Sequence, residues 1–267
     1  MSELWIVDSF ADAPFSGNPA AVCMLPGPRS DSWYQALGAE MQQAATAFIG
    51  RQDGEWSLRW FTATTELQLC GHGTLAAAHF LWESGRLPRT TDARFHSRSG
   101  VLTAASDGDW IVLDFPKTAS TEAAELEGLA EAIGCTPLWI GRSKFDVLVR
   151  VATAERVRSL SPDLARLASI DARGVIVTAE GDTPGVDFVS RFFAPRTGIP
   201  EDPVTGSAHC ALAPYWADQL NRPTLTGYQA SARGGMVRVE VKGERVLLAG
   251  RARTVVRGEL LDNQPAA

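Results

Sequence analysis

Residues 71–82 read GHGTLAAAHFLW, a glycine-rich start that leads into an almost wholly apolar run. A helix that is apolar on nearly every face has to be buried on every face. Its small alanine side chains let the surrounding strands approach closely. The stretch therefore predicts a helix that begins near Gly71 and is enclosed by β-strands.

A second stretch of the same kind follows later in the chain, where residues 206–216 read GSAHCALAPYW. Each stretch comes after a strand-like run, RWFT at 59–62 and RFFA at 191–194, and after a polar loop that ends at a glycine. The offset of about 132 to 135 residues indicates an internal repeat. We expect two similar halves, each with strands around its own helix; chance similarity within a single α+β domain is the alternative.

The rest of the chain alternates short strands with helices, which is typical of an α+β fold. The expected helices include one from Asp31 to about Gln43 and an amphipathic one at 119–132. The latter follows a strand, turn and strand at 94–115. The expected organisation is an N-terminal half at 1–116, a C-terminal half at 117–250, and a closing strand and tail at 251–267 that returns to the N-terminal half.

Composition excludes several classes of protein. The 267 residues carry 25 Lys and Arg against 31 Asp and Glu, a net charge of −6, and form no basic run of the kind that binds nucleic acid. No apolar stretch reaches membrane-spanning length, and the N-terminus reads as a first strand and not as a signal peptide. The cysteines lie far apart, which argues against a metal site and favours a reduced, cytoplasmic setting; they are Cys23, Cys70, Cys135 and Cys210.

The starts of the two apolar helices are the places where a ligand is expected. If the halves are related by a pseudo-twofold axis, both helix N-termini can face one cleft. The free backbone N–H groups and the positive end of each helix dipole then favour a carboxylate. The predicted partner is therefore a small-molecule carboxylate substrate, with no phosphate loop, metal or other cofactor indicated.

Four motifs in a fixed order resemble those of the PhzF-like family of phenazine-biosynthesis isomerases. Asp8 and Phe10 precede GNPAAV at 17–22, LCGH follows at 69–72, EDPVTGS at 201–207 and ARGG at 232–235. The similarity extends from residue 8 to about residue 258. It implies the diaminopimelate-epimerase fold, in which two pseudo-symmetric halves each wrap strands around a central helix, and a cofactor-free site, often in a homodimer.

The resemblance also implies which residues form the site. His72 and Asp202 would order the substrate, and Gly206 and Ser207 would supply donors to its carboxylate. Gly17, Asn18, Gly71 and Gly73 would line the cleft, although a turn requirement explains Gly17 and Asn18 equally well. His79 and His209, within the apolar helices, are expected to be satisfied core residues.

Residue 45 departs from the family pattern. The family's isomerases use a glutamate as the proton shuttle, in a segment similar to MNLSETAF. Here residues 41–48 read MQQAATAF, so the glutamate position is Ala45. Alanine exchanges no proton, and general acid–base catalysis contributes roughly 10²–10⁴-fold. Three explanations for Ala45 are open: the change was engineered, the protein is a natural relative with another base, or the pocket has lost its chemistry. The intact remainder of the signature slightly favours an engineered change.

Cys70 is the strongest substitute base. Residues 70–74, CGHGT, also resemble the first cysteine motif of proline racemases and related hydroxyproline enzymes, in which a thiolate at a helix N-terminus removes an α-proton. Thr205 stands at the matching place in the second half, which argues against two-base racemisation. The alternatives to a PhzF-like isomerase are therefore a Cys70-based racemase, epimerase or dehydratase and a catalytically silent metabolite-binding protein; the plainer interpretation of Cys70 is a packed thiol.

Overall fold

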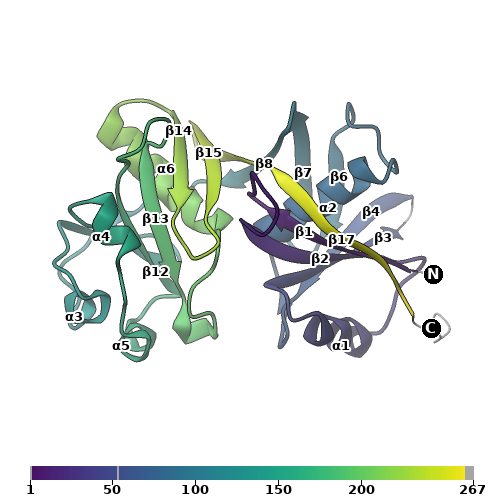
Figure 1. The fold of residues 1–267 in the computed structure, drawn as a ribbon, viewed down its shortest axis with the longest axis horizontal. Helices are drawn as coiled ribbons and strands as arrows, with labels where there is room; N and C mark the ends of the chain where they lie inside the picture. Colours follow the sequence, from purple (N-terminus) through teal and green to yellow (C-terminus); the bar gives the residue numbers. More distant parts are fainter. Residues whose placement is uncertain (1, 53, 262–267) are drawn as a thin grey trace. The chain divides into compact units, whose positions relative to one another are not determined.

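The computed structural model describes residues 2–52 and 54–261, and the chain forms two compact units (Figure 1). Unit 1 contains the residues up to Asp114 together with those from Ala249 onward, and unit 2 contains Phe115–Leu248. The last residues of the expected tail, 262–267, and Met1 lie outside the described residues. Each unit is built from strands around one long helix.

Unit 1 contains nine strands and two helices among its described residues. Its strands are β1 (Ser2–Ser9), β2 (Asn18–Met24), β3 (Ala45–Gln52), β4 (Glu55–Phe61), β5 (Glu66–Leu67), β6 (Ala93–Ser97), β7 (Gly100–Asp107), β8 (Trp110–Pro116) and β17 (Ala252–Leu260). Its helices are α1 (Asp31–Met41) and α2 (Gly71–Glu83).

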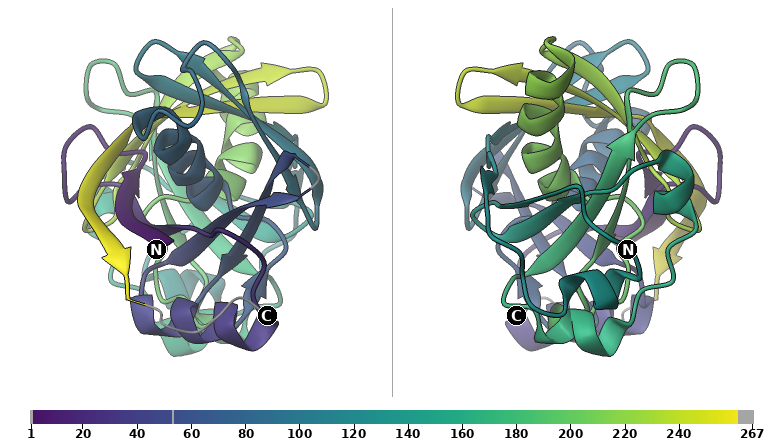
Figure 2. Two further views of the ribbon diagram at one scale, coloured as in Figure 1. Left: turned by 90° about the vertical axis from the view of Figure 1, so that its right-hand side faces the viewer. Right: turned by 90° about the vertical axis from the view of Figure 1, so that its left-hand side faces the viewer.

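The strands of unit 1 alternate between antiparallel and parallel pairing. From β1 to β2 the pairing is antiparallel, from β2 to β3 parallel, from β3 to β4 antiparallel, from β4 to β6 parallel and from β6 to β7 antiparallel. The last strand, β17, pairs antiparallel with β1. Helix α2 packs against β1, β2 and β3, and Figure 2 shows the strands of unit 1 around it. Its residues from Gly73 to Ala78 are all buried.

Unit 2 repeats this scheme. Its elements are β9 (Thr121–Glu122), α3 (Leu129–Ile133), β10 (Trp139–Arg142), β11 (Asp146–Arg150), α4 (Ala154–Arg158), α5 (Leu164–Ser169), β12 (Gly174–Glu180), β13 (Phe188–Phe193), a 3₁₀ turn (Pro195–Thr197), α6 (Gly206–Leu220), β14 (Thr224–Gln229), β15 (Gly235–Lys242) and β16 (Arg245–Gly250). From β10 through β15 the pairings again run antiparallel, parallel, antiparallel, parallel and antiparallel. Helix α6 packs against β11, β14 and β15, so the predicted fold of two similar halves around central helices is confirmed.

Corresponding side chains repeat the same contacts. The Arg59 guanidinium is held by both carboxylate oxygens of Glu66, at 2.7 and 2.8 Å, and Arg191 is held in the same way by Glu201 at the same distances. Each arginine also lies over a phenylalanine ring two residues along its strand. These bidentate pairs tie the polar loop to the strand before it and so fix where the following helix begins.

The helix expected at 119–132 is wrong. The segment holds a two-residue strand, β9, and then the short helix α3, whose first residue is Leu129. Gly128 lies between them with a φ of 76°, a left-handed conformation that an α-helix does not contain. The Ala- and Glu-rich composition favoured a helix, but the glycine delays its start.

Besides the two-residue strands β5 and β9, the strands β10 and β14 were not expected, and each of these two contains a glycine. At Gly141 a Cβ would lie 2.1 Å from the Trp139 ring, and at Gly227 it would lie 2.4 Å from the Phe188 ring. Both glycines thus make room for an aromatic ring to lie on the strand. The segment at 94–115 holds three strands, not two, and its predicted turn at Asp107–Asp109 is confirmed by the pairing of Asp107 with Trp110.

The described part of the chain has no helix that combines the length and the apolar composition needed to cross a bilayer.

Candidate functional site

The start of α2 places a thiol beside an imidazole. Cys70 is the N-cap residue of α2, is only 5% exposed, and its Sγ lies 3.6 Å from Nδ1 of His72. Burial lowers the pKa of His72 to about 4, so its imidazole is neutral near pH 7. A neutral imidazole at this distance can accept a hydrogen bond from the thiol, but a pKa near 4 makes it a weak base.

Residue 45 lies at the same end of unit 1. The Ser9 hydroxyl donates to the His72 carbonyl at 2.8 Å, and Ser9 is paired across the sheet with Asn18, the first residue of β2. Two residues along β2, Ala20 pairs with Ala45, the first residue of β3. The predicted residues Asn18, Ala45, Cys70 and His72 are therefore brought together in unit 1.

The indole N–H of Trp60 is a buried donor that has no hydrogen-bond partner among the described residues. Trp60 is 1% exposed and pairs with Ala47 across β3 and β4. Ala45 lies two residues from Ala47, so both side chains share the sheet face on which the indole lies. Buried donors are almost always satisfied, which marks this place as one where an acceptor is missing.

Local packing or backbone conformation explains why glycine stands at two of the predicted site positions in unit 1, Gly17 and Gly73. A Cβ at Gly73 would lie 2.6 Å from the Trp60 ring and 3.0 Å from Sγ of Cys70, so only glycine lets the helix approach the indole. Gly17 has a φ of 66°, and a Cβ there would lie 2.2 Å from the Ser9 carbonyl oxygen. Gly71 is the first residue of α2. A contact of these glycines with substrate stays a prediction.

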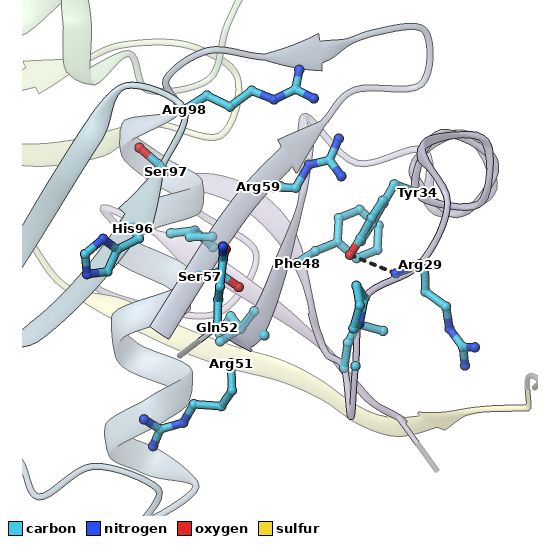
Figure 3. Close-up of a pocket in the computed structure, with 16 residues that line it drawn as sticks. Arg29, Tyr34, Phe48, Arg51, Gln52, Ser57, Arg59, His96, Ser97 and Arg98 are labelled. Atoms are coloured by element: carbon cyan, nitrogen blue, oxygen red, sulfur yellow. Dashed lines mark hydrogen bonds between the residues drawn. The ribbon is translucent and has the colours of Figure 1, made fainter. Parts of the chain in front are cut away.

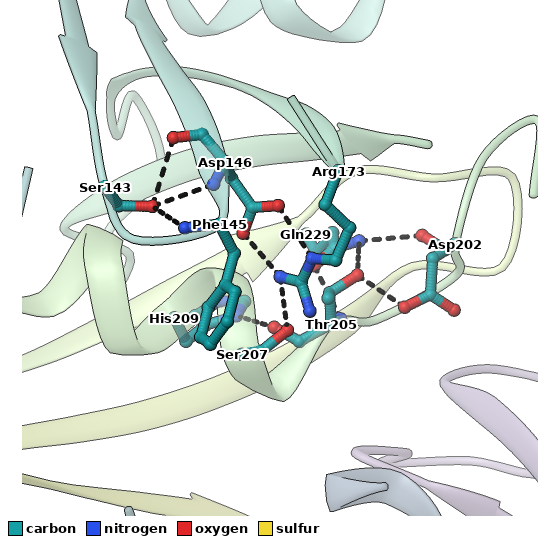
Figure 4. A network of polar contacts seen from close by, with 9 residues as sticks. All are labelled: Ser143, Phe145, Asp146, Arg173, Asp202, Thr205, Ser207, His209 and Gln229. Carbon is teal, nitrogen blue, oxygen red and sulfur yellow. Dashed lines mark hydrogen bonds and ion pairs between the residues drawn. The ribbon is translucent and has the colours of Figure 1, made fainter. Parts of the chain in front are cut away.

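In unit 2, the loop before α6 is held by a network around Thr205 (Figure 4). The Thr205 hydroxyl donates to the Asp202 carboxylate at 2.5 Å, and its backbone N–H donates to the Gln229 side chain at 2.9 Å. The same glutamine donates to the Asp202 carbonyl at 2.7 Å. Asp202 thus orders the loop, and the role predicted for it towards a substrate stays a prediction.

Ser207 contacts an ion pair, formed by Arg173 and Asp146, that the sequence did not predict. Arg173 donates through Nε and Nη2 to the two oxygens of Asp146, at 2.8 and 2.5 Å, and through Nη2 to Ser207 Oγ at 3.0 Å (Figure 4). Asp146 is only 3% exposed. Because Asp146 pairs with Gly174 in the parallel register of β11 and β12, it lies beside residue 173. Gly206, also predicted, is buried and begins α6.

The two histidines expected to be satisfied core residues differ. His79 contacts the Glu83 carboxylate at 2.9 Å and the Thr254 hydroxyl at 3.0 Å. His209 is fully buried, as expected of a core residue, and donates from Nδ1 to the Thr205 carbonyl at 2.8 Å. Its Nε2 has no partner among the described residues, so the side chain is only half satisfied. Burial lowers the pKa of His209 to about 4.

A groove of about 580 Å³ on unit 1 contains none of the predicted site residues. Its lining includes four arginines, which point in different directions (Figure 3); they are Arg29, Arg51, Arg59 and Arg98. Arg59 and Arg98 are paired with Glu66, and Arg51 lies 3.4 Å from the centre of the Trp56 ring. The guanidinium groups of these three serve the protein's own contacts, so the groove is not the candidate site.

Comparison with known proteins identifies the family of the chain. Residues 7–258 match the family model described as phenazine biosynthesis-like protein. An uncharacterized isomerase of Halalkalibacterium halodurans is 46% identical over 259 residues, which cover 97% of this chain and 98% of that protein. The crystal structure of a putative phenazine biosynthesis PhzC/PhzF protein from Clostridium difficile is 35% identical, with a TM-score of 0.92 over 97% of this chain and 99% of that one.

A more distant solved structure shares the fold alone. It is a hydroxyproline epimerase from Agrobacterium vitis with bound trans-4-hydroxy-L-proline, which is 13% identical and has a TM-score of 0.63 over 96% of this chain and 91% of that one.

Proposed function

Because the chain belongs to the phenazine biosynthesis-like protein family, we propose that it is a cofactor-independent isomerase that moves a proton on a small carboxylate-bearing acid. The similarity to a named isomerase supports the reaction class. The substrate class is a cyclic or unsaturated amino or hydroxy acid, in keeping with the cyclic amino acid bound by the distant epimerase. The usual proton shuttle is a glutamate at position 45, which Ala45 replaces in this chain.

The observation that carries this proposal is the unpaired indole N–H of Trp60, on the sheet face that Ala45 shares. Residues diagonally opposite on neighbouring strands are about 7–8 Å apart, within reach of a long side chain. A glutamate at 45 would supply the missing acceptor. Its carboxyl group would also lie at the end of the sheet where the neutral His72 begins α2, in position to exchange a proton with a substrate.

A second function is favoured by the 3.6 Å separation of Cys70 Sγ and His72 Nδ1. The Cys70 thiolate, favoured by the positive end of the α2 dipole, would remove the α-proton of the substrate, whereas the pKa of His72, lowered to about 4, makes this imidazole too weak a base to hold the thiol proton. Since the Thr205 hydroxyl donates to Asp202, it provides no second base. This route leads to one-base epimerisation or dehydration and not to two-base racemisation.

The test is deuterium exchange from D₂O into a panel of small cyclic and unsaturated amino and hydroxy acids. The chain is compared with Ala45→Glu and with the matched control Ala45→Gln, which has the same size but no basic carboxylate. Exchange that rises about 10²-fold or more in the glutamate variant alone supports the glutamate-driven isomerase. Equal exchange in the glutamate and glutamine variants refutes it.

Exchange in the unchanged chain points instead to Cys70, and Cys70→Ser should abolish it. Alkylation by iodoacetamide at Cys70, slowed by the same substrate, would agree. Tight binding of a panel member without exchange in any variant would identify a metabolite-binding protein.

We further propose a homodimer that works in the cytoplasm on a small molecule and binds no nucleic acid. None of the four cysteines, all of which lie in the described part of the chain, forms a disulfide, in keeping with a reducing compartment. Light scattering after gel filtration tests the dimer; a mass of one chain would refute it.

A further inference from the structure

We propose that Arg173 binds the carboxylate of the substrate, together with the hydroxyl of Ser207. The assignment rests on the proposed function for the acidic nature of the substrate. It is carried by the side chains themselves, all of which lie in unit 2 (Figure 4).

Arg173 is held in a fixed orientation. Its Nε and Nη2 donate to the two oxygens of the buried Asp146, and Nη2 donates also to Ser207 Oγ. The aromatic rings of Phe145 and Phe192 lie 5.2 and 5.6 Å from its central carbon. A guanidinium fixed in this way loses little freedom when it binds a ligand.

The outer edge of the same guanidinium is unused. Arginine has five N–H donors, and the three on Nε and Nη2 account for every hydrogen bond that the structure records for this side chain. The two donors on Nη1 have no partner among the described residues. An arginine that served only to neutralise Asp146 would need no more than its inner edge, so the outer edge is available for a second carboxylate.

Ser207 adds a further donor at the same place. Its Oγ accepts the hydrogen bond from Arg173, so its own O–H is directed elsewhere. No acceptor for that hydroxyl is found in the described part of the chain. Phe145, which is 44% exposed, adds an apolar wall beside these donors. Polar donors next to an exposed aromatic ring suit a small acid with a cyclic or unsaturated body.

The test measures binding separately from catalysis. Isothermal titration is carried out with L-proline, trans-4-hydroxy-L-proline, anthranilate and cyclohexanecarboxylate, each beside its neutral carboxamide. The proteins are the unchanged chain, Arg173→Gln, Arg173→Lys and the control Arg158→Gln, which removes an arginine from the exposed pair with Asp182. We expect at least one carboxylate to bind better than its amide and Arg173→Gln to weaken that binding about 10- to 100-fold, the loss of one or two charge-assisted hydrogen bonds. Arg173→Lys should restore part of it, and Arg158→Gln should change nothing.

One variant needs a structural control, because Arg173→Gln leaves the buried Asp146 without its partner. The double variant Asp146→Asn with Arg173→Gln leaves no unpaired charge and should show the same loss of binding while folding normally. Equal carboxylate affinity in all variants, or no preference of the unchanged chain for any carboxylate over its amide, overturns the proposal.

The exchange assay separates this failure from that of the proposed function. If Arg173 is wrongly assigned, exchange by Ala45→Glu persists with an unchanged KM when Arg173→Gln is added. If the isomerase is wrongly assigned, exchange is absent while carboxylate binding still depends on Arg173.

Discussion

A double-mutant cycle on residues 45 and 60 tests whether the buried indole donor is the partner of a missing carboxylate. The four proteins are the unchanged chain, Ala45→Glu, Trp60→Phe and the double variant. Phenylalanine removes the N–H while keeping an aromatic ring against Gly73, which the Trp60 ring closely approaches in the unchanged chain. The cost of the smaller ring is common to both backgrounds and cancels in the cycle.

The sign of the coupling follows from the hydrogen-bonding state of the indole. With alanine at 45 the N–H is buried and unpaired, so its removal relieves a desolvation cost of about 1–3 kcal/mol. With glutamate at 45 the same substitution breaks a hydrogen bond to a charged group, which contributes about 1.5–3 kcal/mol. Trp60→Phe should therefore destabilise the Ala45→Glu protein by about 2.5–6 kcal/mol more than it destabilises the unchanged chain, because the two effects add in the cycle.

Urea unfolding at pH 8, where the carboxyl group is ionised, measures the four free energies. A parallel cycle with Trp56→Phe is the control, because Trp56 lies on the same strand but pairs with Arg51, towards the far end of β3. That cycle should be additive. Additivity within about 0.5 kcal/mol in the Trp60 cycle would show that the two positions do not interact and would remove the structural support for a glutamate at residue 45.

Two other predictions concern the starts of the central helices. Gly73→Ala brings a methyl group to 2.6 Å from the Trp60 ring and should destabilise the protein by about 1–3 kcal/mol in urea unfolding, whereas the control Gly27→Ala, with nothing within 4 Å, should have little effect; equal midpoints would contradict this packing. Burial lowers the pKa of His209 to about 4, so below pH 6.5 the unfolded chain binds a proton at this histidine more readily than the folded chain does. The contribution of His209 to the free energy of unfolding is therefore fully present above pH 6.5 and is lost as the pH falls towards 4. From pH 7 to pH 5 this histidine should account for a loss of about 2 kcal/mol, which His209→Gln should abolish, and an unchanged pH dependence in that variant would refute it.

The fold was predictable because its signals are local and occur twice. The apolar helices at Gly71 and Gly206 leave no polar face, and the runs at 59–62 and 191–194 place a strand before each of them. Both features were confirmed, and the structure adds matching pairs of Arg59 with Glu66 and of Arg191 with Glu201, which were not predicted. Where the prediction failed, at 119–132, one glycine in the left-handed conformation outweighed a favourable composition.

The site was only partly predictable, because some of its contacts depend on strand register. Cys70 and His72 are two residues apart at a helix start, so the sequence alone shows that they are neighbours. Arg173 and Asp146 are separated along the chain by two helices and become neighbours only through the parallel pairing of β11 with β12. The unpaired state of the Trp60 indole likewise depends on what surrounds it in three dimensions and has no counterpart in the sequence.

The pairing of β17 with β1 has a consequence for the order in which the protein is made. Unit 2 lies within one continuous segment, so all of it has been synthesised before the ribosome reaches Ala252. Strand β1, by contrast, is made before unit 2 and keeps an open edge until β17 has been made after it. Exposed strand edges invite pairing with other chains. During translation, therefore, unit 1 is begun before unit 2 and completed after it, and β17 closes an edge of β1 that stays exposed while the whole of unit 2 is made.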